Sequence, residues 1–311
     1  AARAPRVVRS VGVACTAITR EGSLSTLAEQ PVGLGRREVA ARMHELGLQT
    51  WLVVSNVGPN GFDGPLAVDL LANKTRRRAL AERIAHVASN EGFDGVELDL
   101  EMMPKAAATN YAALTREVHE LLHGRLLLAV DVHPKTVDDP GWDGPAAHDY
   151  TALAATGAVL RLMTYDLSVG PVPAGPSTKA SWIREVVAYA RAKGVPAEQL
   201  EIGLPAYGYD FPPKGTPSAL RYDEVTALRE KTKAELLRDE AGVPHFSYDA
   251  GSGGHEVWFD DALSLGRLLT DIGDLAAEVR GVAVWGVGLS DPNLGKCLVD
   301  QGFAVAAAAL R

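Results

Sequence analysis

Residues 92–101 read Gly-Phe-Asp-Gly-Val-Glu-Leu-Asp-Leu-Glu, so that acids occupy every second position near the end of an apolar run. Successive side chains of a β-strand point to opposite faces, and Glu97, Asp99 and Glu101 are therefore predicted to share one face. Carboxyl groups held close together cannot all ionise freely, and at least one keeps its proton. A strand that accepts this cost is typical of a functional site. The stretch therefore predicts a buried strand with a reactive end.

Short apolar runs, typical of buried parallel strands, alternate along the chain with segments of helical spacing. Strands are expected near residues 7–18, 50–54, 96–100, 126–132, 159–165, 201–207 and 282–287. In a chain of 311 residues this alternation predicts the α/β class and, first among its folds, a (β/α)8 TIM barrel. Seven strands are one fewer than a barrel needs. Either two strands are merged near the N-terminus or the chain begins after the first strand.

The alternation breaks after Tyr209, where a Pro- and Gly-rich segment leads into a charged helical stretch. Two aromatic runs, 244–249 and 255–260, then flank Ala-Gly-Ser-Gly-Gly, which predicts a hairpin. We expect residues 212–261 to form a small α+β insertion before the last strand. The whole chain, residues 1–311, is expected to be a single catalytic barrel domain.

The composition limits the class of ligand. The formal charge is −8, which disfavours a nucleic acid as the main partner. The two cysteines, Cys15 and Cys297, lie far apart without metal-ligand spacing, so we expect no disulfide framework, no metal and no cofactor. No run approaches the roughly 20 apolar residues of a membrane span. The first residues lack the apolar middle of a signal peptide and leave the compartment open.

The acids favour glycoside hydrolysis. Glycosidases commonly use one carboxylic acid to protonate the leaving oxygen and a second negative group to stabilise the oxocarbenium-like centre. The three carboxylates lie at the C-terminal end of a strand, where barrel active sites are found, and Glu101 is outermost. A structural ion-pair network is the alternative, and it is disfavoured because no basic residue lies within the strand.

Other polar and aromatic residues follow neighbouring strands. Asp131 and His133 are two residues apart at a strand end, so their side chains share one face. They either reach the cavity of the three acids or form a supporting pair behind it. Aromatic residues on strand-end loops are either sugar-stacking platforms or core and lid residues: Trp142, Tyr207, Tyr209 and Phe211. We expect Trp51 and Trp182 to pack in the core. We expect Trp258 and Phe259 to hold the insertion against the barrel.

The acidic stretch resembles a known signature. Residues 94–101 are similar to the Asp-Gly-x-Asp-x-Asp-x-Glu motif of glycoside hydrolase family 18, with Glu97 in place of an aspartate. Residues 163–166, Met-Thr-Tyr-Asp, resemble the family's Met-x-Tyr-Asp strand, and Trp285 stands where the family has a tryptophan at the end of its last strand. Three further stretches resemble the spore-cortex-lytic branch of the family: 55–56 with the following loop, 203–210 and 255–261.

The resemblance implies a retaining, substrate-assisted mechanism, in which the 2-acetamido oxygen of the substrate attacks the anomeric carbon. It implies Glu101 as general acid and then base, Asp99 as the residue that orients the acetamido group, and Tyr165 as the hydrogen-bond donor to its oxygen. Trp285 is expected beneath the sugar. Further substrate contacts are expected from Glu97, Asp166, Tyr207, Asn56 and Asp131.

The expected substrate is a glycan with β-1,4 linkages at N-acetylglucosamine, with peptidoglycan or spore cortex favoured and chitin oligosaccharides as the alternative. A monomer in an extracytoplasmic compartment (secreted, periplasmic or spore-associated) is favoured. Two other classes remain open. A non-catalytic glycan-binding barrel is disfavoured because the catalytic acids are intact. A metal-dependent phosphodiesterase would use Glu97, Asp99, Asp131 and His133, but the sequence offers no basic pair near these strands to hold a phosphate.

Overall fold

The computed structural model describes residues 8–26, 34–139, 141–251, 253–286 and 288–300. The chain divides into two compact units. Of the residues that the structure describes, the first unit holds those within 163–187 and 202–300, and the second unit those within 8–162 and 188–201. Helix α7 (Ala180–Ala192) and strand β9 (Leu200–Pro205) contain residues of both units.

The second unit is built on a largely parallel sheet with the strand order β8-β7-β6-β3-β1-β2. Its strands are β1 (Ser10–Ile18), β2 (Leu24–Thr26), β3 (Gln49–Ser55), β6 (Gly95–Asp99), β7 (Leu127–Val132) and β8 (Val159–Leu162). Neighbouring strands pair in parallel except β2, which is antiparallel to β1. A short hairpin, β4 (Val57–Gly58) and β5 (Gly61–Phe62), follows β3. The predicted α/β class is confirmed for this unit.

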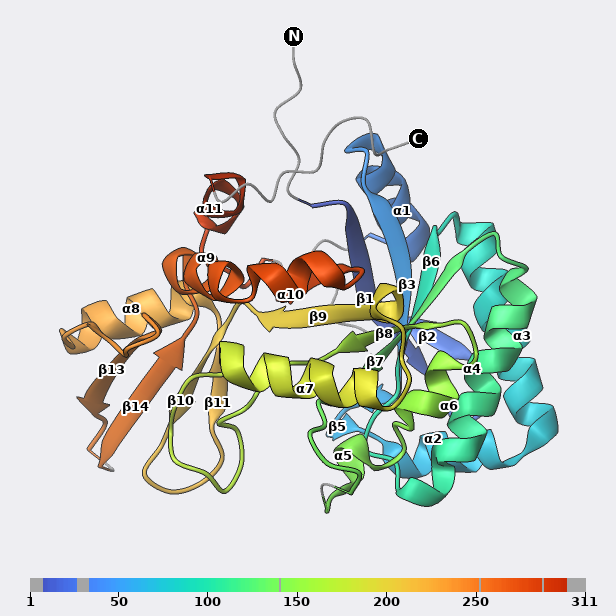
Figure 1. Ribbon diagram of the computed structural model, residues 1–311, viewed down its shortest axis with the longest axis horizontal. Coiled ribbons are helices and arrows are strands. Elements are labelled where there is room, and N and C mark those ends of the chain that lie inside the picture. The colour runs from blue at the N-terminus through green and yellow to red at the C-terminus, as the bar shows by residue number, and fades with distance from the viewer. Residues whose placement is uncertain (1–7, 27–33, 140, 252, 287, 301–311) are drawn as a thin grey trace, which may run out of the picture. The chain divides into compact units, whose positions relative to one another are not determined.

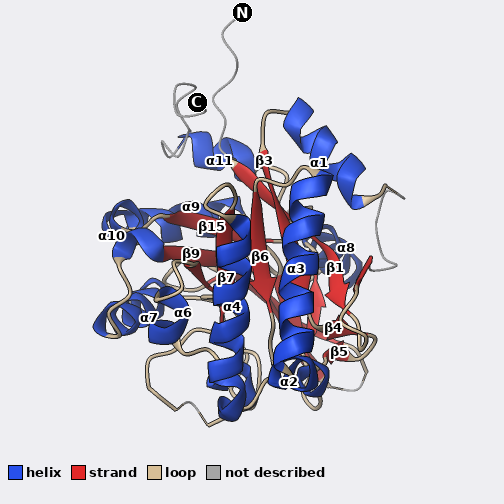
Figure 2. Cartoon of the chain, turned by 90° about the vertical axis from the view of Figure 1, so that its right-hand side faces the viewer, coloured by secondary structure: helices blue, strands red, loops and turns tan. Residues whose placement is uncertain are grey.

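The helices of the second unit are α1 (Arg36–Glu45), α2 (Gly64–Ala72), α3 (Lys74–Glu91), α4 (Ala108–Leu122), α5 (Asp143–Ala146) and α6 (Tyr150–Ala154), with 3-10 turns at Lys105–Ala107 and Ala197–Gln199. Figure 2 shows α3 and α4 side by side across β3, β6 and β7. Leu80, Ile84 and Ala88 recur every fourth residue of α3 and are fully buried. Asn73 caps α3 through the N–H groups of Thr75 and Arg76, and such a cap contributes about 1 kcal/mol.

Strand β6 is the predicted acidic strand, and it lies between β3 and β7. Leu98 pairs with Val54 of β3 and with Val130 of β7, and all three side chains are fully buried. Burying a leucine side chain of this kind contributes about 1.5–3 kcal/mol. Glu97 lies on the opposite face, as the period of two predicts. The buried apolar residues on one face of β6 therefore fix the position of the acidic residues on its other face.

The first unit contains a five-stranded antiparallel sheet with the order β11-β10-β14-β13-β12. Its strands are β10 (Gly208–Phe211), β11 (Ser218–Leu220), β12 (Leu237–Arg238), β13 (Pro244–Asp249) and β14 (Gly254–Phe259). Figure 1 shows α8 (Tyr222–Thr232) along this sheet, where Val225, Phe246, Val257 and Phe259 form a buried cluster. The predicted hairpin is confirmed by the pairing of β13 with β14. The assignment of residues 212–261 as an insertion within one catalytic domain stays a prediction.

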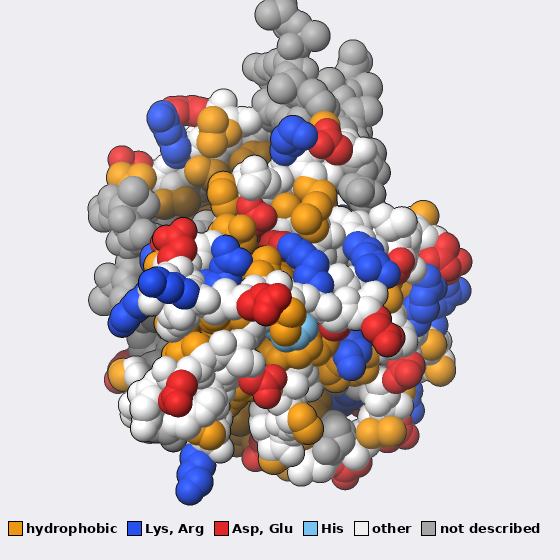
Figure 3. All heavy atoms as spheres, turned by 90° about the vertical axis from the view of Figure 1, so that its left-hand side faces the viewer, with side chains coloured by type: hydrophobic (Ala, Val, Ile, Leu, Met, Phe, Trp, Pro, Cys, Tyr) orange, Lys and Arg blue, Asp and Glu red, His pale blue; other side chains and the backbone are white. Residues whose placement is uncertain are grey.

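The remaining described elements of the first unit are α9 (Ala262–Asp271), α10 (Gly273–Glu278), β15 (Gly281–Trp285) and α11 (Leu294–Asp300). Strand β15 neighbours β9, and the N–H of Ala206 donates to the carbonyl of Trp285 at 3.0 Å. Figure 3 views the molecule from the side of α8 and β14 and shows basic and acidic side chains interspersed on that face. No described helix combines the length and the apolar character needed to cross a membrane.

Each of the seven predicted strands is present among the described residues, with shifted ends. Strand β8 ends at Leu162 and β9 at Pro205, three and two residues earlier than predicted. Tyr165 and Tyr207 therefore lie on the segments that follow these strands. Trp51 is buried, as expected.

Candidate active site

Glu101 lies just beyond β6, and Asn56 fixes its backbone. The side-chain amide of Asn56 donates to the Glu101 carbonyl at 2.9 Å, and the Glu101 N–H donates to Asn56 Oδ1 at 2.9 Å. Asn56 follows β3 and is 1% exposed. A buried amide that uses both its donor and its acceptor on one residue holds that residue firmly. Asn56 therefore positions Glu101, and its expected contact with a substrate stays a prediction.

The chain turns sharply after Glu101. Met102 has a φ of 58°, in the left-handed region that residues other than glycine rarely adopt. The Met102 carbonyl also lies so close to Gly64, at the start of α2, that a Cβ there would be 1.8 Å from the oxygen. A glycine at residue 64 is therefore required for this turn, and the backbone on both sides of Glu101 is constrained.

The carboxyl group of Glu101 contacts His133, which follows β7. His133 Nε2 lies 2.6 Å from Glu101 Oε2. The backbone N–H of His133 donates to His148 Nδ1 at 2.9 Å. The proton of the neutral His148 ring is therefore on Nε2, which lies 3.0 Å from the Leu100 carbonyl. Burial lowers the pKa of His148 to about 3, so this ring is neutral. The neutral His148 thus links the backbone of Leu100, just before Glu101, to His133, which contacts the Glu101 carboxyl group.

Trp142 completes the surroundings of His133. Its ring centroid lies 5.0 Å from that of His133 in an edge arrangement, and half of the residue is exposed. The His148 ring stacks on His133 from another side, at 5.6 Å. His133 is therefore held by rings while its Nε2 contacts Glu101. The sequence singled out His133 and Trp142 but missed His148, whose burial leaves no periodic signal.

The other acids form a buried group around Arg161 on β8. Arg161 forms an ion pair with Glu97, and its Nε and Nη2 donate to Glu201 Oε2 at 3.0 and 2.9 Å. Its Nη1 lies 3.9 Å from Asp131 Oδ1. The prediction disfavoured an ion-pair network because β6 carries no base, and it missed that β8 supplies one. An arginine between Leu160 and Leu162, in an otherwise apolar strand, was the available signal.

These acids differ in how readily they ionise. Burial opposes ionisation of Glu97, but the charge of Arg161 and a hydrogen bond from Asp131 outweigh it, so the pKa of Glu97 is lowered. Burial raises the pKa of Asp99 well above its usual range, and the charge of Glu101 raises it further. Burial and the charge of Glu97 do the same for Asp131. The pKa of Glu97 is thus lowered, while the pKa values of Asp99 and Asp131 are raised.

The first unit holds a second group of predicted residues around Asp166. The hydroxyl groups of Tyr207 and Tyr209 donate to Asp166 Oδ1 at 2.7 and 3.0 Å. Burial and the charge of Asp166 raise the pKa of both phenols, so they remain protonated donors. The ring of Tyr165 packs edge-on against Tyr207, with centroids 6.3 Å apart.

A cavity of about 180 Å³ adjoins this group. It is lined by Asp166, Tyr207, Tyr209, Ala219, Leu220, Arg221, Trp285 and Leu289. Trp285 is 49% exposed, so its ring is available to a ligand. The amphipathic tryptophan ring and the phenols suit the apolar face and the hydroxyl groups of a sugar.

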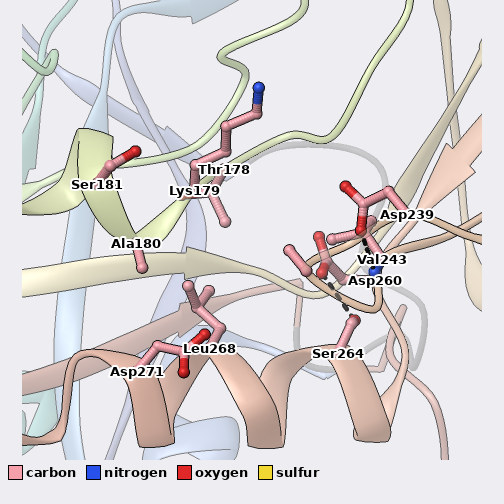
Figure 4. Close-up of a pocket in the computed structure, with 11 residues that line it drawn as sticks. Thr178, Lys179, Ala180, Ser181, Asp239, Val243, Asp260, Ser264, Leu268 and Asp271 are labelled. Carbon is pink, nitrogen blue, oxygen red and sulfur yellow. Dashed lines mark hydrogen bonds between the residues drawn. The ribbon is translucent and has the colours of Figure 1, made fainter.

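A larger cavity of the first unit, about 240 Å³, contains no predicted site residue (Figure 4). It is lined by the start of α7, by one side of α9 from Ser264 to Asp271, and by the loop before β13. Figure 4 shows the carboxyl groups of Asp239 and Asp260 together at one side, with Ser264 donating to Asp260 Oδ1 at 2.9 Å. Burial raises the pKa of Asp260 to about 7.

The structure thus gathers the predicted residues into two groups. The second unit brings together Asn56, Glu97, Asp99, Glu101 and Asp131. The first unit brings together Tyr165, Asp166, Tyr207 and Trp285. Among the described residues, no three His, Cys, Asp or Glu side chains are arranged to hold a metal ion.

Comparison with known proteins gives a consistent result. A family model described as Glycosyl hydrolases family 18 matches residues 54–289. The cortical fragment-lytic enzyme of Bacillus subtilis (strain 168) is 30% identical over 258 residues, which are 80% of this chain and 59% of that protein. The chain therefore spans about three fifths of the length of this relative.

Two other relatives extend the comparison. The crystal structure of the spore cortex-lytic enzyme SleL of Bacillus megaterium QM B1551 superposes with a TM-score of 0.79 at 26% identity, covering 96% of this chain and 68% of that one. The class V chitinase CHIT5 of Lotus japonicus is 25% identical over 278 residues, or 75% of this chain and 66% of that protein. The fold is that of the TIM-barrel relatives, which confirms the predicted architecture.

Proposed function

Because this chain belongs to glycosyl hydrolase family 18, we propose that it is a retaining glycosidase that cleaves β-1,4 linkages at N-acetylglucosamine. The observation that carries the proposal is the arrangement at the end of β6. Glu101 is fixed by Asn56 on its backbone and by His133 at its carboxyl group, and burial raises the pKa of the neighbouring Asp99. An acid held in place next to a carboxyl group with a raised pKa is suited to proton transfer to a leaving oxygen.

The proposed roles follow the family resemblance. Glu101 protonates the glycosidic oxygen and later activates the water. The substrate's acetamido oxygen attacks the anomeric carbon, so the protein needs no nucleophile of its own. Asp99 orients the acetamido N–H and stabilises the cyclic intermediate, and the Tyr165 hydroxyl donates to the acetamido oxygen. Trp285 lies under the sugar ring.

The supporting residues have separate proposed roles. Asp166 accepts hydrogen bonds from the hydroxyl groups of Tyr207 and Tyr209, and its proposed role is to contact the sugar together with Tyr207. Glu97 and Asp131 act behind Asp99 in the second unit. Asn56 acts through the Glu101 backbone.

Peptidoglycan of the cell wall or spore cortex is the proposed polymer. The relatives named for cortex lysis support this choice. A relative named as a chitinase supports chitin oligosaccharides as the second candidate. The names of the first relatives also support an extracytoplasmic, spore-associated site of action, and a monomer remains the expected state.

The test compares the wild-type protein with Glu101→Gln on cortex peptidoglycan and on chitin oligosaccharides. We expect the wild type to release fragments that end in N-acetylglucosamine with the β-anomer formed first. Glu101→Gln is expected to lose at least about 100-fold in kcat while it still binds the glycan. Fragment masses, the NMR signal of the first anomer and calorimetric binding are the measurements.

The control is Glu82→Gln, which changes an exposed glutamate paired with Arg78 on α3. It is expected to cleave at the wild-type rate. Cleavage by Glu101→Gln at the wild-type rate would contradict the assigned acid. Tight binding by the wild type without cleavage of either glycan would support the non-catalytic glycan-binding alternative instead.

A further inference from the structure

Arg161 contacts carboxyl groups from three other strands. It pairs with Glu97 of β6, its Nη1 lies 3.9 Å from Asp131 Oδ1 of β7, and its Nε and Nη2 donate to Glu201 Oε2 of β9. The side chains of these residues are only 9–16% exposed. Charges that are shielded from water interact strongly and are costly when left unpaired. One guanidinium therefore compensates a group of buried acids.

The sheet register explains how Arg161 reaches Glu97. Glu97 is paired with Ala129 of β7, and Arg161 of β8 is paired with Asp131, two residues further along β7. Ala129 is fully buried and has only a methyl group. A larger side chain at residue 129 would occupy the space between the two long side chains. The small residue leaves a path from β8 across β7 to β6.

Glu97 is also accommodated from the other side. A Cβ on Gly12 of β1 would lie 3.1 Å from Glu97 Oε2, so the glycine leaves room for this carboxyl group. The guanidinium lies over the ring of Trp51, 5.6 Å from its centroid. Glu97 is one methylene longer than the aspartate of the signature that residues 94–101 resemble. The surroundings thus fit an arginine and a glutamate as a matched pair.

We propose that Arg161 is a positioning residue, which keeps Glu97 ionised by pairing with it from β8. The proton that the acids of this group share is thereby left on Asp99, next to Glu101. Arg161 itself does not touch the substrate. Its effect passes through Glu97, which forms an ion pair with Arg161 and accepts a hydrogen bond from Asp131. Asp99 then has Glu101 as the neighbouring charge that most affects it.

The first experiment is independent of activity. Glutamate carrying 13C in the carboxyl group is incorporated, and Glu97→Gln assigns the signal of Glu97 in the NMR spectrum. We expect the Glu97 signal to stay that of a carboxylate between pH 5 and 8. In Arg161→Met its titration midpoint is expected to rise by about one pH unit or more, since a neighbouring cation lowers a carboxyl pKa by about 1–3 units. Arg161→Lys is expected to keep most of the wild-type value.

The second experiment measures kinetics and rests on the proposed function. Arg161→Met is expected to lower kcat by about tenfold to 100-fold with little change in KM, and to move the acidic limb of the pH profile upward. Adding Glu97→Gln to Arg161→Met removes the carboxylate of Glu97, which has lost its pairing with the Arg161 cation. The double variant is expected to recover part of the lost kcat. A merely structural role would give losses that add up.

The matched control is Arg77→Met. Arg77 lies on α3 of the same unit and is 7% exposed. Its Nε and Nη2 donate to Glu117 of α4. This variant is expected to lose stability but to leave the Glu97 signal and the pH profile unchanged. It therefore reports what the loss of a buried arginine costs by itself.

A protonated Glu97 at pH 6 in the wild-type protein would overturn the proposal, even if Arg161→Met does not fold. An unchanged Glu97 midpoint in folded Arg161→Met would overturn it as well. Failure of the proposed function is a different result: the wild type would then cleave no N-acetylglucosamine glycan, while the NMR titration would still show whether Arg161 fixes the charge of Glu97.

Discussion

His133 Nε2 and Glu101 Oε2 lie 2.6 Å apart, and they come from segments that follow adjacent strands of the sheet. The contact is short enough for a strong, charge-assisted hydrogen bond. His148 fixes the backbone of His133 from the far side, so the contact has defined geometry. The role proposed for Glu101, to give a proton and later take one back, depends on this kind of support.

His133→Ala is therefore expected to reduce kcat by about tenfold to 100-fold with a small effect on KM. The Glu101 carboxyl group loses its partner and its orientation, whereas the residues proposed to bind the sugar are untouched. Steady-state kinetics on the glycan that the wild type cleaves is the measurement. His86→Ala is the control, because His86 is exposed on α3 and its ring hydrogen-bonds with Asn90 on the same helix. Equal kcat for His133→Ala and the wild type would remove His133 from the site.

Asn56→Ala removes both hydrogen bonds to the Glu101 backbone. It leaves a buried N–H and a buried carbonyl without partners, which is expected to cost about 2–4 kcal/mol of unfolding free energy and to lower kcat. Denaturant unfolding and kinetics measure the two effects. The control is Asn73→Ala, which removes the cap of α3 and is expected to cost about 1 kcal/mol with kcat unchanged. If the two variants lose kcat equally, Asn56 has no special link to Glu101.

The position of the reactive strand was predictable because its signal is local. A period of two places Glu97, Asp99 and Glu101 on one face in any strand, and the apolar residues between them favour burial. The ends of β8 and β9 were less predictable. Tyr165 and Tyr207 belong to apolar runs that continue past the last sheet pairing, and composition does not mark where that pairing stops.

The partners of the acids were not predictable by the same reasoning. Arg161 reaches Glu97 across an intervening strand, so the pair depends on the register of β6, β7 and β8 together. His148 contacts His133 through a loop and a short helix that follow no repeating pattern. Such contacts are set by the packed fold, and the sequence showed only that a charged residue interrupts an apolar strand.

Gly64→Ala is expected to disturb Glu101 from a distance. The added methyl group would overlap the Met102 carbonyl, 1.8 Å away, so the turn after Glu101 must move. We expect a loss of about 1–3 kcal/mol from overpacking together with a marked fall in kcat. Thermal unfolding and kinetics are the measurements. Gly273→Ala in α10 is the control, since nothing lies within 4 Å of the added Cβ and helical alanine is favoured. A Gly64→Ala protein with wild-type kinetics would show that the turn tolerates the shift.

Asp260 is expected to make the stability of the protein depend on pH. Burial raises the pKa of Asp260 to about 7, against a value of about 3.9 in an unfolded chain. Between these values the folded state binds more protons than the unfolded state, so stability falls as the pH rises from 4 to 7 and stays low above 7. The full effect is at most about 4 kcal/mol. Asp260→Asn cannot ionise at this residue and is expected to lose less stability than the wild type between pH 5 and pH 8, while the raised pKa values of Asp99 and Asp131 still contribute a fall in both proteins. Asp69→Asn, at an exposed residue paired with Arg76, should retain the wild-type fall. If Asp260→Asn and the wild type show the same loss between pH 5 and pH 8, Asp260 is ionised in the folded protein at both pH values.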